Sequence, residues 1–281
     1  MVHWILRLAV FACYVGHGAF GIITKDAWVP YFGVVGIPEA AAWRLMPVVG
    51  TVDIVLGILA LVRPMPVVLL YMTVWSVWTA LLRPLTGEPV WEFLERAGNY
   101  GVPLAFLVWS RPGPRLRDWF ALIRVPSGLP PHPERLAWIL RITTAALLIG
   151  HGGFGAFMQK AAWIGYFGAV GITPKLAEGA SLIALVGWFE IALGLLVLAK
   201  PVPAVLVFIF AWKVGTELLR PTVGEPVWEF IERGGSYAAP LALLYMQRWA
   251  GATVAEAAQP RHATVRPVPL STAPLAARAK A

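Results

Sequence analysis

The stretch WILRLAVFACYVGHG (residues 4–18) returns later in the chain as WILRITTAALLIGHG (residues 138–152). Both copies are mainly apolar, and about 20 residues of this kind span the hydrocarbon core of a bilayer. Because lipid offers no hydrogen-bond partner to an exposed backbone, such a run must be a helix. The second copy is internal and cannot be removed as a signal peptide, so we expect the first copy to be a retained membrane helix as well.

The composition is typical of a membrane protein. Of the 281 residues, 58% are hydrophobic and 14% are charged, whereas soluble domains carry about 25% charged residues. The net charge of +8 comes largely from loop and tail residues, as the positive-inside rule requires, so nucleic acid is not an expected partner. The single cysteine, Cys13, excludes an internal disulfide, a CxxC redox pair and a cysteine-based zinc site.

The repeat extends over nearly the whole chain. His17 aligns with His151 and Asp53 with Glu190, at an offset that begins at 134 residues and settles at 137. We therefore predict an all-α integral membrane protein with eight transmembrane helices, arranged as two parallel-oriented four-helix bundle repeats. The expected helices are residues 4–23, 41–62, 65–82 and 89–109 in the first repeat, and 137–158, 177–199, 202–219 and 226–247 in the second.

Two further segments complete the predicted organisation. Residues 1–110 and 137–248 are the repeats. Residues 111–136 form a basic, Pro-rich linker on the cytoplasmic side, in which RDWFALIR (117–124) fits a short interfacial helix. Residues 249–281 form a basic tail that is rich in Ala and Pro and has no periodicity, which predicts disorder.

Lysine and arginine set the expected orientation. The linker and the tail are rich in arginine, and Arg63 and Lys200 lie on the same side. We therefore place both termini in the cytoplasm and the protein in a bacterial-type plasma (inner) membrane, with the lipid bilayer as its first partner. Because each repeat has an even number of helices, both repeats point the same way, and the axis that relates them should follow the membrane normal.

Three stretches of the first repeat resemble the DoxX-like family of four-helix membrane proteins: RLAVFACYVGHGAFG (7–21), YFGVVGIP (31–38) and VVGTVDIVLGILALV (48–62). The second repeat carries similar features, so the chain looks like two such units in tandem. The resemblance implies a four-helix bundle for each unit. Some members are linked to quinone-coupled oxidation of sulfur compounds, as subunits of thiosulfate:quinone oxidoreductase, but the family fixes no catalytic residue for this chain.

Four ionisable residues lie inside expected membrane helices: His17, His151, Asp53 and Glu190. Ionisable groups at this depth are costly and usually functional, so we predict that these four residues bind a cofactor or ligand, as quinone contacts or as a proton relay. Two facing histidines could also hold one b-type haem, with the neighbouring glycines making room for the porphyrin. Alternatively, each histidine bonds a carboxylate of its own bundle and the glycines serve helix packing.

A charged segment, LLRPLTGEPVWEFLERAGNY (81–100), returns as LLRPTVGEPVWEFIERGGSY (218–237) with 15 of 20 positions identical. One interpretation is an interfacial ion-pair staple, because Glu92 and Arg96 share a helix face. The others are an outward-facing polar pocket under each hairpin and a docking surface for an outer-side protein partner. The residues of the two expected pockets are Arg83, Glu88, Trp91, Glu92, Glu95 and Arg96, and Arg220, Glu225, Trp228, Glu229, Glu232 and Arg233.

The two repeats differ at one pair of positions. Lys213 and Glu217 are four residues apart in the second repeat, where the first repeat has Ser76 and Ala80. An ion pair inside a membrane helix usually faces a bundle interior or a cavity, so we add both residues to the second polar pocket and expect any chemistry confined to one repeat to lie there. The alternative is a neutralising pair near the outer interface. No tight spacing of carboxylates and histidines predicts a metal site.

The sequence favours a membrane subunit of a redox system that binds a quinone, or another small apolar or redox ligand, between or within the repeats. A small-molecule or lipid transporter is one alternative, because parallel repeats around a central site suit alternating access. A non-catalytic accessory or assembly protein is another. No P-loop, GxSxG or dinucleotide-binding fingerprint occurs, so nucleotide-driven chemistry is not expected.

Overall fold

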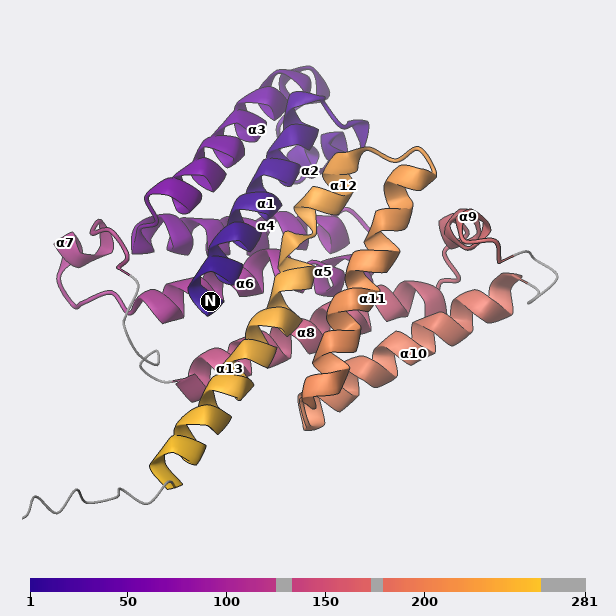
Figure 1. Cartoon of the computed structure of the whole chain (residues 1–281). Coiled ribbons are helices and arrows are strands. Elements are labelled where there is room, and N and C mark those ends of the chain that lie inside the picture. Colours follow the sequence, from indigo (N-terminus) through magenta and orange to yellow (C-terminus); the bar gives the residue numbers. More distant parts are fainter. Residues whose placement is uncertain (125–132, 173–178, 259–281) are drawn as a thin grey trace, which may run out of the picture.

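The computed structural model describes residues 1–124, 133–172 and 179–258, and all regular secondary structure in this part is helical (Figure 1). The first elements are α1 (Val2–Ile22), a 3-10 turn (Asp26–Trp28), α2 (Val29–Val34), α3 (Glu39–Val62), α4 (Pro66–Leu85), α5 (Val90–Glu95), α6 (Ala97–Ser110) and α7 (Leu116–Trp119). The later ones are α8 (Pro133–Ala156), α9 (Ala162–Ala169), α10 (Gly179–Ala199), α11 (Pro203–Thr222), α12 (Val227–Glu232) and α13 (Gly234–Ala258).

The predicted all-α class is confirmed, and five of the described helices are long and apolar enough to cross a membrane. They are α1, α3, α4, α8 and the part of α10 from Leu182 to Ala199. Two of the other expected spans are not long enough or not apolar enough to meet this description. α6 has only 14 residues, and α11 carries Lys213, Glu217 and Arg220 within its 20 residues, although about 20 mainly apolar residues are needed to span a bilayer.

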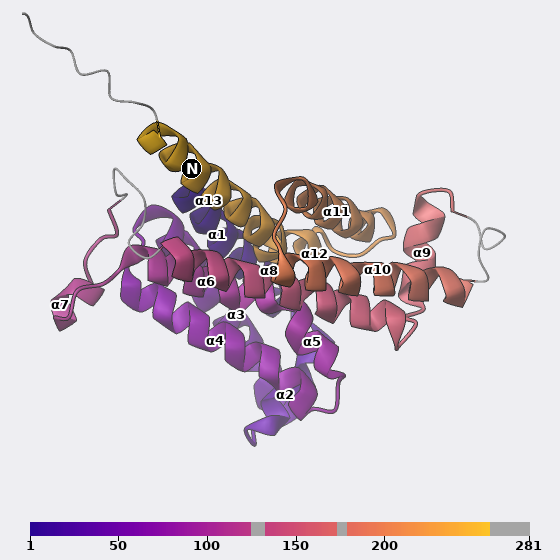
Figure 2. The same cartoon turned by 90° about the horizontal axis from the view of Figure 1, so that it is seen from below.

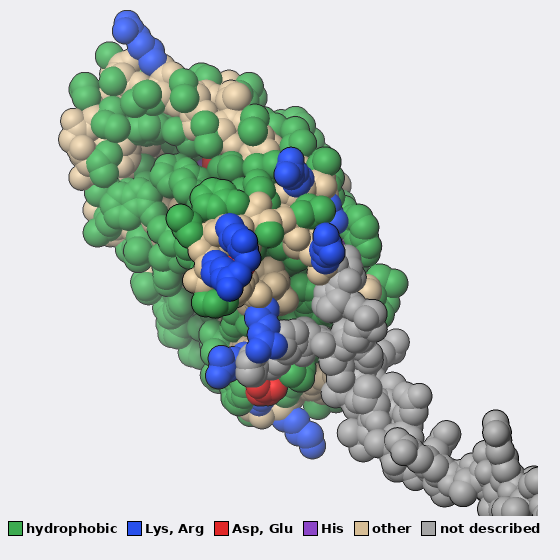
Figure 3. Space-filling view, turned by 90° about the vertical axis from the view of Figure 1, so that its left-hand side faces the viewer, with side chains coloured by type: hydrophobic (Ala, Val, Ile, Leu, Met, Phe, Trp, Pro, Cys, Tyr) green, Lys and Arg blue, Asp and Glu red, His purple; other side chains and the backbone are tan. Residues whose placement is uncertain are grey.

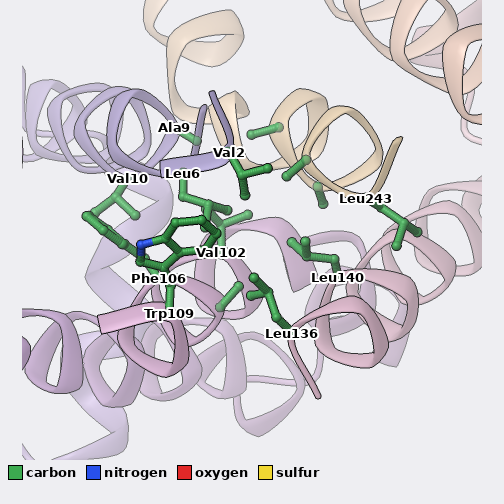
Figure 4. Packing of buried hydrophobic residues seen from close by; sticks show 14 of the residues in the cluster. Val2, Leu6, Ala9, Val10, Val102, Phe106, Trp109, Leu136, Leu140 and Leu243 are labelled. Atoms are coloured by element: carbon green, nitrogen blue, oxygen red, sulfur yellow. The ribbon is translucent and has the colours of Figure 1, made fainter. Parts of the chain in front are cut away.

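The centre of the molecule is built by both halves of the sequence, residues 1–110 and 137–248. Helices α6 and α13 pack against each other and against both α1 and α8, and these four helices supply most of the largest buried apolar cluster. Figure 4 shows Leu6 of α1, Phe106 of α6 and Leu140 of α8 in this core. In the most apolar window of α1 and α8, 56% and 61% of the residues are buried, against 28% in α3 and α10. The outer helices α3 and α10 therefore present an apolar surface that suits lipid.

Glycine allows close helix contacts in both halves. A Cβ atom on Gly18 of α1 would lie 2.5 Å from the carbonyl oxygen of Gly50 in α3. In the same way, a Cβ on Gly152 of α8 would lie 2.5 Å from the carbonyl oxygen of Gly187 in α10. Small residues at such crossings let membrane helices approach until their backbones touch. Each half is thus held together by the same type of helix pair.

The last predicted helix of each half is interrupted. The sequence predicts single helices over 89–109 and 226–247, but the structure divides them into α5 and α6, and into α12 and α13. Glycines follow both breaks, and glycine weakens a helix interior. The Tyr100 hydroxyl donates to the carbonyl oxygen of Phe93 at 3.2 Å, so a carbonyl near the break gains a partner outside the helix ladder.

These short helices are exchanged between the halves. α5, from the first half, packs against α8 of the second half, and α12 packs against α1 of the first (Figures 1 and 2). A Cβ on Gly150 of α8 would lie 2.5 Å from the carbonyl carbon of Leu94 in α5, and a Cβ on Gly16 of α1 would lie 2.6 Å from the Cα of Glu232 in α12. Each duplicated segment therefore closes against the opposite half.

Residues 111–124 of the basic linker lie at one end of the molecule, marked by α7 on the left of Figure 1. Figure 3 views this end, where Lys and Arg side chains gather over an otherwise apolar face. α7 overlaps the interfacial helix predicted at 117–124, and the amide of Ile123 donates to the carbonyl oxygen of Pro64 at 2.9 Å. The predicted tail is wrong at its beginning, because α13 continues to Ala258 through an alanine-rich stretch with high helix propensity. Residues 125–132 and 259–281 lie outside the described part.

Candidate functional site

Two apolar cavities occupy equivalent places in the two halves. The first has a volume of about 290 Å³ and lies among α1, α2, α3 and α4. The second has a volume of about 520 Å³ and lies among α8, α9, α10 and α11. The residues lining both cavities at aligned positions include His17 and His151, Trp28 and Trp163, Tyr31 and Tyr166, Phe32 and Phe167, Trp75 and Trp212, and Arg83 and Arg220.

A histidine that is hydrogen-bonded to a buried carboxylate lines each cavity. In the first half, Nδ1 of His17 lies 2.7 Å from a carboxylate oxygen of Asp53, which is only 1% exposed. The imidazole of His17 stacks on Trp28, with 4.6 Å between the ring centroids. Since the carboxylate accepts the hydrogen bond at Nδ1, the other ring nitrogen, Nε2, is left for the cavity. Among the described residues no hydrogen-bond partner reaches it.

The second half repeats this arrangement with a longer acid. Nδ1 of His151 is hydrogen-bonded to Glu190, a carboxylate with no exposed surface, and the imidazole stacks on Trp163 at 4.8 Å. The second oxygen of Glu190 accepts a hydrogen bond of 2.7 Å from the indole nitrogen of Trp212. His151, Glu190 and Trp212 therefore form a continuous polar chain along the cavity wall.

The shorter aspartate breaks this chain in the first half. Among the described residues, neither the Oδ1 atom of Asp53 nor the indole nitrogen of Trp75, the counterpart of Trp212, has a hydrogen-bond partner. One methylene fewer explains the difference, because the carboxylate reaches the histidine but not the tryptophan. The polar groups of the first cavity are thus less completely bonded than those of the second.

Shortening the acid of the second half should reproduce this defect. We expect Glu190→Asp to lose the bond to Trp212 and to lower the free energy of unfolding by about 2 kcal/mol, as for other hydrogen bonds to a charged group. Asp53→Glu is the matched control and should be neutral or stabilising. Thermal unfolding in a mild detergent measures both; equal midpoints for Glu190→Asp and the wild type would contradict this assignment of the bond.

One glycine makes the second cavity the larger of the two. Trp78 lines the first cavity, and its counterpart in the second is Gly215. A Cβ added to Gly215 would meet no atom within 4 Å. The indole that narrows the first cavity is therefore missing from the second, where its space remains open.

A tyrosine and an arginine also line each cavity. Tyr31 donates a hydrogen bond to Glu88, and its ring faces the guanidinium of Arg83 at 5.2 Å. Burial is the main reason that the pKa of Tyr31 is raised to about 12, so the phenol keeps its proton and acts as the donor. Tyr166 and Glu225 are bonded in the same way in the second half.

The charged side chains of the two duplicated segments form a single network between the halves. The exchanged helices account for this, since Glu95 of the first half lies 3.3 Å from Arg233 of the second. Two lysines at aligned positions also pair with the opposite half. Lys25 of the first half pairs with Glu229 at 2.8 Å, and Lys160 of the second half pairs with Glu92 at 3.9 Å.

Arg233 stands at the centre of this network. Besides Glu95, it pairs with Glu217 at 3.0 Å and with Glu229 at 2.7 Å. Glu217 is also paired with Lys213 at 3.1 Å. The space that remains beside the network amounts to about 10 Å³, so these side chains fill the junction between the halves.

The remaining members of the predicted pockets also have internal partners. Arg96, which follows the last residue of α5, pairs with Glu92, and Glu232 accepts a 3.5 Å hydrogen bond from Asn99. Trp91 stacks on Phe157 at 5.3 Å. Trp228 packs on the apolar cluster of the first half that contains Phe20, Trp28, Tyr31, Ala42, Met46 and Leu82. Of the predicted pocket residues, only Arg83, Arg220 and Glu217 line the apolar cavities.

One group of side chains has a geometry that resembles a metal site. Ligand atoms of Glu95, His151 and Glu217 lie within 4.8 Å of one another. Arg233 contacts both of these carboxylates, and Arg220 pairs with Glu217 at 2.6 Å. Since cationic side chains already neutralise the carboxylates, the arrangement favours an ion-pair network over a bound divalent cation.

The expected space for a porphyrin is occupied by protein. The two histidines line separate cavities. The glycines beside them are in close contact with backbone: Gly16 with Glu232 of α12, and Gly18 with Gly50 of α3. The geometry therefore matches the packing interpretation of these glycines, because backbone atoms fill the space beside them.

The sequence predicts that the histidines, their carboxylates and the arginines beside the cavities belong to a site, but it does not predict the aromatic walls. Trp28, Tyr31 and Trp75 are identical to their counterparts in the second half. This identity is the signal from which the aromatic walls could have been predicted. The short helices α2 and α9, which carry several of these residues, were also not predicted. No protein-family profile, no curated protein and no solved structure matches this chain.

Proposed function

We propose that this protein is a membrane subunit of a quinone-linked redox system and that it binds a quinone head group in the second cavity. The observation that carries the proposal is an apolar cavity of about 520 Å³ that is lined by His151, hydrogen-bonded to the fully buried Glu190. Cavities of about 300–1,000 Å³ with apolar walls and a few convergent polar groups suit flat small molecules. The resemblance to DoxX-like proteins supports the same class of ligand.

The His151–Glu190 pair supplies the proton chemistry that such a ligand needs. Reduction of a quinone to a quinol takes up two electrons and two protons. The electrons would come from an outer-side redox partner. Because Nδ1 of His151 is bonded to Glu190, Nε2 is left for the cavity, where the imidazolium can give one proton to a quinone oxygen; the second proton would come from the aqueous phase. The carboxylate of Glu190 stabilises the imidazolium and keeps the ring in its orientation.

The proposal includes the arrangement of the chain in the membrane. Eight spans in two parallel repeats would give the two cavities the same depth and orientation. The basic end seen in Figure 3 would face the cytoplasm of a bacterial-type cell, together with both termini. Arg7 and Arg141 support this equivalence, because each donates to a carbonyl oxygen at the end of the neighbouring helix: Arg7 to Val62 at 3.0 Å and Arg141 to Val197 at 2.9 Å.

A titration with a short-chain benzoquinone tests the proposal. Quinones quench tryptophan fluorescence, and Trp163 and Trp212 line the second cavity. We expect saturable quenching of the wild type, and His151→Ala should weaken binding by about tenfold, as for the loss of about 1.4 kcal/mol. His17→Ala, in the first cavity, is the matched control and should bind with wild-type affinity.

Two outcomes would count against the proposal. Quenching without saturation would mean that the quinone partitions into the detergent and has no site on the protein. Equal loss of affinity in His151→Ala and His17→Ala would mean that binding does not depend on the second cavity. A transporter of another solute or an assembly protein would show either of these results.

A further inference from the structure

The guanidinium of Arg83 is buried beside the first cavity with few partners. Its residue is 7% exposed and lines the cavity. It donates one hydrogen bond, of 3.4 Å, to the carbonyl oxygen of Thr79, and within the described residues its Nε has no hydrogen-bond partner. Its nearest carboxylate, Glu92, is 3.7 Å away and is already bonded to Arg96. A buried guanidinium with five N–H donors is therefore left largely unsatisfied.

The equivalent arginine of the second half is fully paired. Arg220 contacts Glu217 at 2.6 Å and Glu225 at 2.9 Å. The first half lacks the main partner, because Ala80 occupies the position of Glu217. No described residue takes over this role, and Glu88, the counterpart of Glu225, is bonded to Tyr31 instead. The second cavity thus contains its own anion next to the arginine, whereas the first cavity does not.

We propose that the first cavity binds an amphiphile whose head is a singly charged oxyanion, a carboxylate or a phosphate, with Arg83 as the binding group. A buried charge is costly unless it is paired, and the planar guanidinium fork matches an oxyanion in a bidentate geometry. The ligand's anion would occupy the role that Glu217 fills in the other half. This site is separate from the quinone site proposed above and does not depend on it.

The rest of the cavity is suited to an apolar chain. Its walls include Trp28, Phe32 and Val49. At its mouth, Val35 and Leu45 line the cavity and are 54% and 37% exposed. A volume of about 290 Å³ is near the lower limit of ligand cavities. It fits a head group with the first part of a tail, and the remainder of the tail would leave past Val35 and Leu45 along the apolar outer surface.

Equilibrium binding of radiolabelled dodecanoate tests this inference on the full chain in a neutral maltoside detergent. We expect saturable binding that 1-dodecanol, which has the same tail without the charge, displaces at least about tenfold less effectively. Acetate and inorganic phosphate are the small-anion probes, and they should compete only weakly because they lack the tail. This comparison needs no substitution and is therefore independent of any folding defect.

Two variants locate the site. Arg83→Gln removes the charge, and Ala80→Glu gives the first half the carboxylate that the second half has in Glu217. Each should weaken dodecanoate binding by at least about tenfold, while Arg117→Gln, which removes an exposed arginine that lines neither cavity, should leave it unchanged. Gel filtration checks that each variant remains folded. Wild-type affinity in both Arg83→Gln and Ala80→Glu would overturn the inference.

The competition experiment has two further outcomes that would overturn it. Dodecanol that displaces as well as dodecanoate would mean that the charge is not recognised and that the cavity takes any apolar chain. Phosphate or acetate that competes as well as dodecanoate would assign Arg83 to a small water-soluble anion. The two sites can fail independently. A protein that binds dodecanoate but no quinone would leave this site standing without the one in the second half, and a protein that binds quinone but no dodecanoate would do the reverse.

Discussion

Arg233→Met should abolish the stable fold or lower the free energy of unfolding by about 3–5 kcal/mol, as for other buried ion pairs that lose one partner. Arg233 pairs with Glu95, Glu217 and Glu229, and the exposed fractions of these carboxylate side chains are 8%, 2% and 13%. Without the guanidinium, three negative charges would remain close together in a buried site. Because Glu95 belongs to the other half, the substitution should also loosen the junction between the halves.

Arg117→Met is the matched control. Arg117 is 74% exposed, and its only described ion pair is with Asp118 at 3.9 Å. Exposed pairs of this kind contribute about 0–1 kcal/mol, so the unfolding midpoint should not move. Thermal or denaturant unfolding in detergent, followed by circular dichroism, compares the two variants. Similar midpoints for Arg233→Met and Arg117→Met would show that the buried network does not stabilise the fold.

Gly150→Ala should be strongly destabilising for so small a substitution. A Cβ at this position would lie 2.5 Å from the carbonyl carbon of Leu94 and closer still to the amide of Glu95. Both are backbone atoms of α5, and they cannot move aside as a flexible side chain would. Overpacking typically costs about 1–3 kcal/mol and occasionally more, and we expect the upper part of this range, with separation of α5 from α8.

Gly215→Ala is the control, because it places the same methyl group on another helical glycine. A Cβ at Gly215 meets nothing within 4 Å. Replacing glycine by alanine inside a helix usually stabilises it by about 1 kcal/mol, so this variant should be as stable as the wild type or more so. If Gly150→Ala behaves like Gly215→Ala, α5 does not pack against α8 as described.

The sequence alone was sufficient to predict where the long helices lie and which ionisable groups pair beside the cavities. The repeated apolar runs predicted all the long helices, and the alignment of His17 with His151 and of Asp53 with Glu190 identified groups that are paired within each half. The interpretation of the flanking glycines as packing residues also agrees with their contacts. Periodicity and alignment are sufficient for the two histidine–carboxylate pairs because each pair lies within one repeat.

The exchange of α5 and α12 could not be predicted in this way. A repeat makes Glu95 and Glu232 equivalent, but it does not say which half each one contacts, since both arrangements satisfy the same pattern. The break near Arg96 was also missed, because the glycines that follow it read equally well as small residues in a membrane helix. The partners of Arg233 depend on both features, so the network emerged only with the three-dimensional arrangement.

The size of the second cavity is another feature that the sequence did not reveal. Gly215 in place of Trp78 reads as one of many differences between the repeats. Only the packing of α11 shows that this position faces the cavity. The same holds for Ala80 in place of Glu217, which becomes informative only because Arg83 is buried next to it.

The quinone content of the purified protein is the most direct measurement of the proposed function. Wild type, Gly215→Trp and Trp78→Gly would be purified in a mild detergent, extracted with organic solvent and analysed by chromatography with mass spectrometry. The open space at Gly215 allows the new indole to fill the second cavity. We expect about one quinone per chain in the wild type and in Trp78→Gly, which changes only the first cavity, and loss of it in Gly215→Trp. No quinone in the wild type, or equal amounts in all three proteins, would contradict a quinone site in the second cavity.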